Sequence, residues 1–237
     1  MTRHHYERTQ DFNRITRYLH AIRYRNLERI ARTLVPAYGP RLRVLDIGCG
    51  PASAFRVLDD LRSDIEYLGI ELRKDFCDLA AGRYSAHGNF RIARANIADR
   101  LDLIDRFDLI IGLESFEHIP ECVVVRVAEA IGASEFQRLY ITVPNEIGPA
   151  VAMKNIGSWL MGYVRHREYS WKETFHASIY DLDRVGRHGT GHKGFDWRWL
   201  AQTLRQNVTI TRKFTSPVRF VPMALSPSIG FLCERRR

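Results

Sequence analysis

The sequence VLDIGCGP, residues 44–51, combines a buried strand, a Gly-x-Gly turn and the first turn of a helix. Glycine permits a tight turn and lets a ligand approach the backbone, and a helix N-terminus presents N–H groups without partners inside the helix. In open α/β sheets, ligands bind beyond the carboxyl ends of the strands. The stretch therefore predicts an α/β fold with a ligand site at the end of this strand.

From residue 41 onward, predicted strands alternate with predicted helices. The first five strands are 41–48, 65–71, 90–95, 107–113 and 138–144. The helices between them begin at Pro51 or span 73–84 and 121–132. This alternation predicts a mostly parallel sheet with helices on both faces. After a helix at 196–206, strands 208–214 and 228–233 follow with no helix between them, so an antiparallel hairpin is expected to complete a seven-stranded sheet.

Two segments stand outside this alternation. Residues 13–35 have apolar residues at helical spacing, with most of the arginines off that stripe. Residues 145–190 are rich in Trp and Tyr and show few clear periods, which suggests an insertion or lid over the carboxyl edge of the sheet. The predicted organisation is an N-terminal helical lid at 1–40 and a ligand-binding domain at 41–237 that carries this insertion.

The composition is that of an ordinary folded protein, with 45% hydrophobic and 27% charged residues, which excludes a disordered chain and a collagen-like repeat. Lysine and arginine number 36 against 27 acidic residues, for a net charge of +9. The excess lies at the ends, because residues 1–40 carry +5 and 197–237 carry +7, whereas 41–196 carry −3. Basic ends favour an anionic substrate, RNA or a membrane surface, unless they only form solvated helix faces.

The cysteines and the hydropathy pattern bound the protein class. The four cysteines form no CxxC pair, which argues against a disulfide framework and a thiolate zinc site. No apolar run approaches the ~20 residues that a membrane-spanning helix needs, and the first residues do not resemble a signal peptide. We therefore expect no transmembrane segment and a cytoplasmic location.

Three polar residues at predicted strand ends describe the ligand. Asp46, two residues before the first glycine, would repel a pyrophosphate but can bind an ammonium group directly or through water. Glu71, at the end of the second strand, is placed to accept hydrogen bonds from both hydroxyls of a ribose. Asn96 follows the third strand, near the expected position of an adenine edge. An amine, a ribose and an adenine without a pyrophosphate describe S-adenosylmethionine (SAM).

Residues 41–144 resemble the class I SAM-dependent methyltransferases. VLDIGCG is similar to their glycine motif, LGIEL to their ribose-binding strand, and FDLIIGLESFEHIP to the motif at their fourth strand. The resemblance implies a Rossmann-like fold with SAM as cofactor. It also implies a set of cofactor-binding residues: Asp46, Gly48, Cys49, Gly50, Glu71, Asn96, Ile97 and Glu114. Cys49 would be a small residue packed in the turn, and Asn96 replaces the commoner Asp.

Polar residues after the fourth strand face the expected cleft. The sequence there is Glu114-x-x-Glu117-His118, and His192-Lys193-Gly194-Phe195-Asp196-Trp197 follows much later. Ubiquinone-biosynthesis O-methyltransferases share a similar Glu-His motif at the fourth strand. Small-RNA 3′-terminal 2′-O-methyltransferases have an E-x-x-E-H motif and a distal His. The resemblance to the RNA enzymes implies a divalent metal held by four residues: Glu114, Glu117, His118 and His192.

Three interpretations of this group stay open. Two carboxylates and two imidazoles can hold a divalent metal, although metal-free class I methyltransferases share parts of the motif, so SAM without a metal is the preferred set of cofactors. Without metal, His118 or His192 can accept the proton of an acceptor hydroxyl, which makes Glu117, His118 and His192 the candidate catalytic residues. Both histidines can also be structural groups.

The sequence thus predicts a SAM-dependent methyltransferase that methylates a hydroxyl of a small molecule, glycan or lipid precursor. RNA ribose 2′-O-methylation is the alternative enzymatic interpretation. A SAM-fold protein that has lost catalysis and serves as a binding partner is the second alternative.

Overall fold

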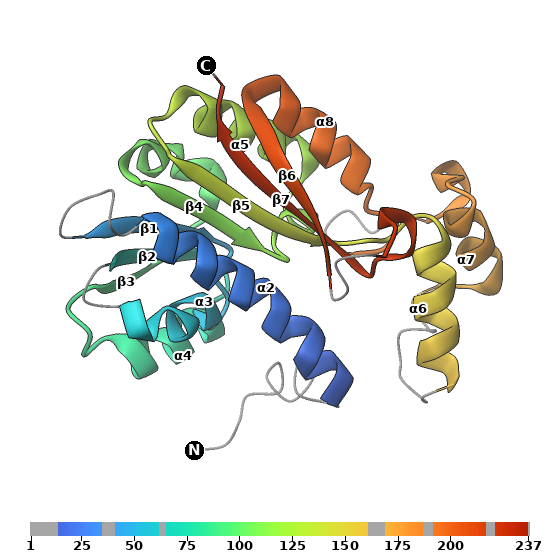
Figure 1. Ribbon diagram of the computed structural model, residues 1–237, viewed down its shortest axis with the longest axis horizontal. Coiled ribbons are helices and arrows are strands. Elements are labelled where there is room, and N and C mark those ends of the chain that lie inside the picture. Colours follow the sequence, from blue (N-terminus) through green and yellow to red (C-terminus); the bar gives the residue numbers. More distant parts are fainter. Residues whose placement is uncertain are drawn as a thin grey trace.

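The computed structural model describes residues 14–34, 41–61, 65–160, 169–186, 192–216 and 221–236. The helices, drawn in Figure 1, are α2 (Arg14–Leu34), α3 (Ser53–Val57), α4 (Lys74–Tyr84), α5 (Glu121–Ala133), α6 (Pro149–Leu160), α7 (Trp171–Ser178) and α8 (Trp197–Asn207). The strands are β1 (Leu42–Ile47), β2 (Ile65–Glu71), β3 (Phe90–Arg94), β4 (Leu109–Leu113), β5 (Arg138–Pro144), β6 (Val208–Ser216) and β7 (Ser228–Arg235). Short 3-10 turns lie in several of the connections.

These strands form one seven-stranded sheet in the order β3-β2-β1-β4-β5-β7-β6. Strands β1 to β5 pair in parallel, whereas β7 pairs antiparallel with both β5 and β6. The predicted fold, a mostly parallel Rossmann-like sheet with an antiparallel C-terminal hairpin, is confirmed. Because the order reverses beside β1, the loops after β1 and β4 diverge, and such a point is where open α/β sheets bind ligands.

Each face of the sheet is covered by its own helices. On one face, the strand residues Leu45 and Ile47 pack in a core that includes α5 and α8. On the other face, Leu42 and Val44 pack in a core that includes α2, α3 and α4. Side chains of β1 alternate between the two cores, as the two-residue period of a strand requires. The sheet is therefore buried on both sides, and its polar groups at the strand ends are left to form a site.

Helix α2 packs against the sheet by its C-terminal half. Leu27, Ile30, Ala31 and Leu34 are buried in the second core, beside α3. That the whole segment 1–40 acts as a lid stays a prediction, since residues 1–13 and 35–40 lie outside the described residues. None of the helices in the described ranges combines the length and hydropathy that a membrane crossing needs.

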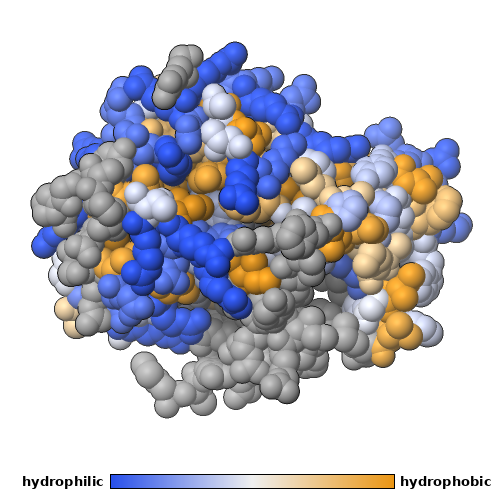
Figure 2. All heavy atoms as spheres, viewed as in Figure 1, coloured by the Kyte–Doolittle hydropathy of each residue, from blue (hydrophilic) through white to orange (hydrophobic). Residues whose placement is uncertain are grey.

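Among the described residues between β5 and α8, two helices, α6 and α7, are present that the sequence pattern did not predict. Buried Val151, Tyr169, Ala177 and Val185 form a small core of their own in this segment. Apolar residues are also exposed on the outer sides of both helices: Met153, Ile156, Trp159, Leu160, Trp171, Phe175, Ile179 and Tyr180. Figure 2 shows orange, hydrophobic patches on the surface over this part of the molecule. In α6 the exposed apolar residues Met153, Ile156 and Leu160 follow helical spacing, but the opposite, buried face includes the polar residues Asn155 and Ser158, so the helix does not have the usual pattern of an apolar buried face and a polar exposed face.

Candidate functional site

A cavity of about 600 Å³ opens at the carboxyl ends of the parallel strands. Helix α2 contributes Arg23 and Tyr24 to its wall. The structure brings all eight predicted cofactor-binding residues to this one cavity: Asp46, Gly48, Cys49, Gly50, Glu71, Asn96, Ile97 and Glu114. They lie at the carboxyl ends of β1 and β2 or in the segments that follow β1, β3 and β4, four strands that are neighbours in the sheet.

Asp46 is buried at the end of β1 and carries one unsatisfied oxygen. The Tyr67 hydroxyl donates a 2.6 Å hydrogen bond to Asp46 Oδ2. Asp46 Oδ1 is buried and has no hydrogen-bond partner among the described residues. Burial raises the pKa of Asp46 to about 7, although the hydrogen bond from Tyr67 lowers it and the charge of Glu71 raises it further. A lone buried acceptor beside a cavity fits the ammonium group of the cofactor.

Gly48 and Gly50, in the loop after β1, each have a positive φ but differ in what surrounds them. Gly48 has φ +69°, and a Cβ built there would lie 2.5 Å from Ser115 Cβ. Gly50 has φ +55°, and its Cβ would meet no atom within 4 Å. Gly48 therefore allows two loops to touch, whereas Gly50 leaves open space beside the cavity. This space and the unsatisfied Asp46 oxygen together fit a bound cofactor.

Glu71 joins the loops after β1 and β2. Its Oε2 accepts a 2.9 Å hydrogen bond from the Gly50 N–H, and its Oε1 accepts a 2.8 Å bond from the Arg73 N–H. Each carboxylate oxygen keeps a lone pair that can accept from a ribose hydroxyl. Cys49 lines the cavity, but its thiol packs where a side chain on Gly69 would lie, and burial raises the pKa of that thiol. Its packing thus agrees with the small turn residue expected.

Asn96 and Glu114 close two sides of the cavity. The Asn96 side-chain oxygen accepts from the Ala98 N–H at 3.1 Å and so caps the short helical turn that contains Ile97. Glu114 has a left-handed φ of +56°, and its Oε1 accepts a 2.8 Å hydrogen bond from the Ser228 hydroxyl. The same oxygen lies 3.6 Å from Arg23 Nη1. Glu114 is thereby turned toward β7 and α2.

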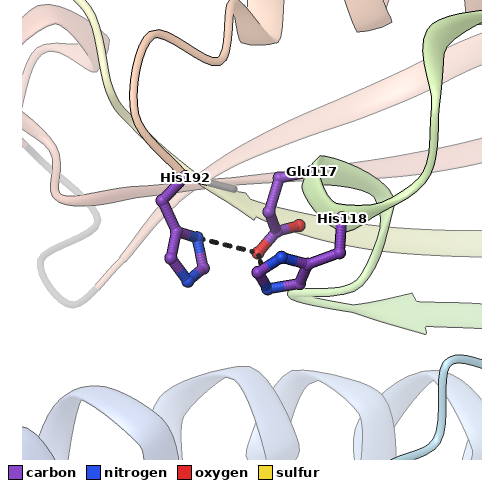
Figure 3. A group of neighbouring side chains, drawn as sticks. All are labelled: Glu117, His118 and His192. Carbon is purple, nitrogen blue, oxygen red and sulfur yellow. Dashed lines mark ion pairs between the residues drawn. The ribbon is translucent and has the colours of Figure 1, made fainter. Parts of the chain in front are cut away.

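Glu117, His118 and His192 come together beside the cavity, as Figure 3 shows. Glu117 Oε1 lies 3.4 Å from His192 Nδ1 and 4.0 Å from His118 Nε2. The Glu117 side chain is fully buried, whereas those of His118 and His192 are 46% and 40% exposed. His118 also lines the cavity itself. His192, 75 positions further along the chain than Glu117, is thus in contact with the motif that follows β4.

This group is electrostatically unusual. Apart from the ion pairs of Glu117 Oε1 with the two histidines, neither carboxylate oxygen of Glu117 accepts a hydrogen bond within the described residues. Burial raises the pKa of Glu117, while the nearby His192 lowers it. For His192, burial lowers the pKa, but the close Glu117 carboxylate outweighs burial and the net pKa is raised. Unsatisfied buried carboxylates are costly, so such an arrangement points to a functional role.

The insertion holds the loop that carries His192. The Gly194 N–H donates a 2.9 Å hydrogen bond to the Tyr169 hydroxyl, which in turn donates to Glu146 Oε2 at 3.1 Å. Glu146 is fully buried and pairs with Lys154 at 2.9 Å. Tyr67, Tyr169 and Glu146 were not among the site residues predicted from the sequence. The Pro-Asn-Glu turn that ends β5 was the signal available for Glu146.

Three of the four candidate metal ligands have atoms within 4.8 Å of one another: Glu117, His118 and His192. Carboxylate and imidazole donors suit a divalent ion, and the unsatisfied Glu117 oxygens leave its coordination sites open. Glu114 is not part of this group, because Ser228 and Arg23 engage its carboxylate. The three residues fit a divalent metal, but the four-residue set does not assemble in this structure.

Comparisons with known proteins agree with this geometry. Residues 45–133 match a family model described as a methyltransferase domain. No curated protein sequence matches the chain significantly.

Several solved structures share its fold. Magnesium protoporphyrin IX methyltransferase from Synechocystis PCC 6803, with bound S-adenosylhomocysteine (SAH), is 16% identical; the match covers 94% of this chain and 88% of that chain, with a TM-score of 0.57. The methyltransferase domain of bacterial CtHen1 is 13% identical over 92% of this chain and 98% of that chain, with a TM-score of 0.62. A SAM-dependent methyltransferase from Clostridium acetobutylicum ATCC 824 is 11% identical over 90% and 92%, with a TM-score of 0.58. Residues 45–133 thus match a methyltransferase domain, and the seven-stranded fold of the chain is the one that these solved methyltransferase structures share.

Proposed function

We propose that this methyltransferase acts on a hydroxyl oxygen and that His192 accepts the hydroxyl proton. The observation that carries the proposal is the buried Glu117 carboxylate 3.4 Å from His192 Nδ1, beside a cavity that His118 lines. A carboxylate on Nδ1 favours the tautomer with its proton there, which leaves Nε2 as the basic atom. A hydroxyl needs such a base, because its proton must leave as the oxygen gains a methyl group.

The cofactor half of the site is assigned by residue type. The Asp46 carboxylate and the backbone of Gly48 and Gly50 would hold the methionine part of SAM. Glu71 would hold the ribose, and Asn96 with Ile97 the adenine. When bound, SAM supplies an electrophilic methyl group on a sulfonium sulfur. The protein then contributes mainly orientation, by holding the acceptor oxygen in line with that methyl group.

The acceptor is assigned as a small molecule, a glycan or a lipid precursor. One protein of similar fold is by name a magnesium protoporphyrin IX methyltransferase, which acts on a small molecule. The first test is therefore a labelling experiment. The purified protein is mixed with methyl-labelled SAM and a cell extract, and organic-soluble, nucleic-acid and protein fractions are counted. Label in the small-molecule or lipid fraction, in a product whose mass and fragmentation show a methyl ether, is expected. Label confined to protein would overturn the assignment.

The rate of this transfer is expected to fall as the pH is lowered. His192 must be neutral to accept a proton, and its pKa is raised above the ordinary value of an imidazole. The neutral form is therefore lost as the pH falls through this raised pKa, and the rate falls with it. Label transfer at saturating SAM, measured from pH 6 to 9, checks this. His192→Gln should abolish the pH-dependent limb, and a variant that keeps the wild-type profile would exclude His192 as the base.

Tyr169→Phe is expected to slow label transfer by roughly 10-fold, because the Gly194 N–H in the loop that carries His192 loses its acceptor, the Tyr169 hydroxyl. SAH binding should stay unchanged, since Tyr169 does not line the cofactor cavity. Isothermal titration calorimetry and the transfer assay separate the two effects. Tyr180→Phe is the matched control, because its hydroxyl lies beside Gly148 in the same insertion. Equal losses in both variants would mean that Tyr169 has no particular link to His192.

RNA ribose 2′-O-methylation is the second candidate, and the metal-compatible group of Glu117, His118 and His192 is the observation that favours it. On this alternative, label would enter the nucleic-acid fraction, and EDTA would stop the transfer until Mn²⁺ or Mg²⁺ is restored. The protein would also retain RNA at low salt, where phosphate contacts are strongest. Transfer that is unaffected by EDTA would exclude the metal, and absence of RNA retention at low salt would exclude the RNA substrate.

A further inference from the structure

We propose that Tyr67 is a positioning residue for cofactor binding. Its hydroxyl would fix the Asp46 carboxylate so that Asp46 Oδ1 can bind the amino group of SAM. Tyr67 does not itself line the cavity and would act only through its hydrogen bond to Asp46, which does. The inference rests on the cofactor role assigned to Asp46. It is independent of which acceptor is methylated and of the proton acceptor.

The sheet register explains how the phenol reaches the carboxylate. On β1 and β2, Val44 lies opposite Tyr67 and Asp46 lies opposite Gly69. Val44, Asp46, Tyr67 and Gly69 therefore share one face of the sheet. The Tyr67 ring extends along β2 past Gly69, where Cys49 Sγ occupies the space of a side chain and a Cβ would lie only in van der Waals contact with Tyr67 Cε1, at 3.4 Å. The hydroxyl then meets Asp46 Oδ2 at 2.6 Å.

Packing fixes the ring in this position. Tyr67 is fully buried, stacks on Phe90 at a centroid distance of 5.6 Å and contacts Phe55 at 5.4 Å. A ring held on two sides cannot swing away from Asp46 without opening the core. The carboxylate is therefore held by a rigid donor on one oxygen, while the other oxygen stays unsatisfied beside the cavity.

The charges around Asp46 make this hydrogen bond important. The titratable groups that face it are Tyr67 and Glu71 from β2, Cys49 from the loop after β1, and Tyr24 from α2. None of them is a cation, and Glu71 disfavours the charged carboxylate. Of these groups, Tyr67 is the one whose hydrogen bond stabilises the ionised form, with burial opposing it. Without its hydroxyl, Asp46 would be protonated over a wider pH range and could not attract an ammonium group.

The test compares SAH binding by calorimetry at pH 6, 7, 8 and 9 for the wild type and for Tyr67→Phe. We expect the variant to bind about 10-fold more weakly at pH 7 and to recover toward wild-type affinity at pH 9, where Asp46 ionises without help. Where Asp46 is protonated in the free protein, SAH binding should release that proton. This proton release should continue to a higher pH in Tyr67→Phe than in the wild type, and calorimetric titration in two buffers of different ionisation enthalpy measures it. Asp46→Asn should bind weakly at every pH.

The control removes a hydroxyl from the same aromatic cluster. Tyr84 packs on Phe55 and Phe90, so Tyr84→Phe should keep the wild-type pH profile of SAH binding. A uniform loss of affinity at all four pH values in Tyr67→Phe would mean a merely structural role and would overturn the proposal. So would an unchanged profile, or a wild type that does not bind SAH. Because no acceptor is present, failure of the O-methylation proposal leaves this result unaffected.

Discussion

Glu117→Gln is expected to reduce methyl transfer by about 100-fold or more, because it removes the charge that orients and stabilises the proton-accepting imidazole. Glutamine has nearly the same shape, so the buried site stays filled. The carboxylate lies 3.4 Å from His192 Nδ1, and a neutral amide cannot stabilise the imidazolium that forms as the hydroxyl loses its proton. The labelled-SAM transfer assay measures this loss.

The same variant should leave cofactor binding and folding intact. Glu117 does not line the cofactor cavity, so the affinity for SAH measured by calorimetry should stay within about twofold of the wild type. Burial raises the pKa of Glu117 in the folded state, and such a carboxylate costs stability once the pH rises above its unfolded pKa. Removing the charge should therefore leave the Tm unchanged or raise it. A variant with full transfer activity would refute the proposed role of Glu117.

Gly48→Ala is expected to have the largest effect on the fold and on cofactor binding together. Its φ of +69° is strained for alanine by about 1–2 kcal/mol, and the added Cβ would lie 2.5 Å from Ser115 Cβ. To relieve this contact, the loops after β1 and β4 must move apart, which adds about 1–3 kcal/mol of overpacking. Thermal unfolding should show a Tm lower by roughly 5–15 °C, and calorimetry should show SAH binding weakened at least about 10-fold.

Gly50→Ala is the matched control for this clash. Gly50 also has a positive φ, +55°, but an added Cβ would meet no atom within 4 Å. Gly50→Ala should be destabilised only by the backbone strain of about 1–2 kcal/mol, so its Tm should fall less than that of Gly48→Ala. Gly88→Ala, at an exposed glycine with neither a positive φ nor a close neighbour, sets the baseline. Equal Tm losses at Gly48 and Gly50 would contradict the importance of the contact with Ser115.

The fold could be predicted from the sequence because local patterns decide most of it. Strands 65–71 and 138–144 agree with β2 and β5 at both ends, since a strand buried on both faces is a compact apolar run. The helix expected to begin at Pro51 is shorter, with α3 ending at Val57 and a 3-10 turn following it. The helices α6 and α7 of the insertion were not predicted, because both expose apolar side chains and bury polar ones such as Asn155 and Thr174, the reverse of the pattern expected for a helix on a protein surface.

The candidate site was predicted in part for the same reason. Asp46, Glu71 and Asn96 lie at or just after the carboxyl ends of predicted parallel strands, which meet at one edge of the sheet, so the pattern of strands was enough to predict that they share a site. Tyr67 and Tyr169 act through hydroxyl groups placed by sheet register and by the insertion, and no local spacing reports such tertiary contacts. The engagement of Glu114 with Ser228 is of this kind too, because β7 lies more than 100 residues further along the chain. His192 was found only through resemblance of its motif.

The hydrogen bond between Tyr169 and Gly194 also limits how this enzyme could be redesigned. An exchange of residues 149–186 for the corresponding segment of another methyltransferase would be a natural way to change the acceptor. Such a chimera would bring new acceptor contacts but would lose the hydroxyl that anchors the His192 loop. The segment that would be exchanged to change the acceptor therefore also contains the hydroxyl that holds the His192 loop in place. Because Glu146 lies before the exchanged segment and would be kept, a successful graft would need a hydroxyl at the position of Tyr169 that accepts from the Gly194 N–H and donates to Glu146.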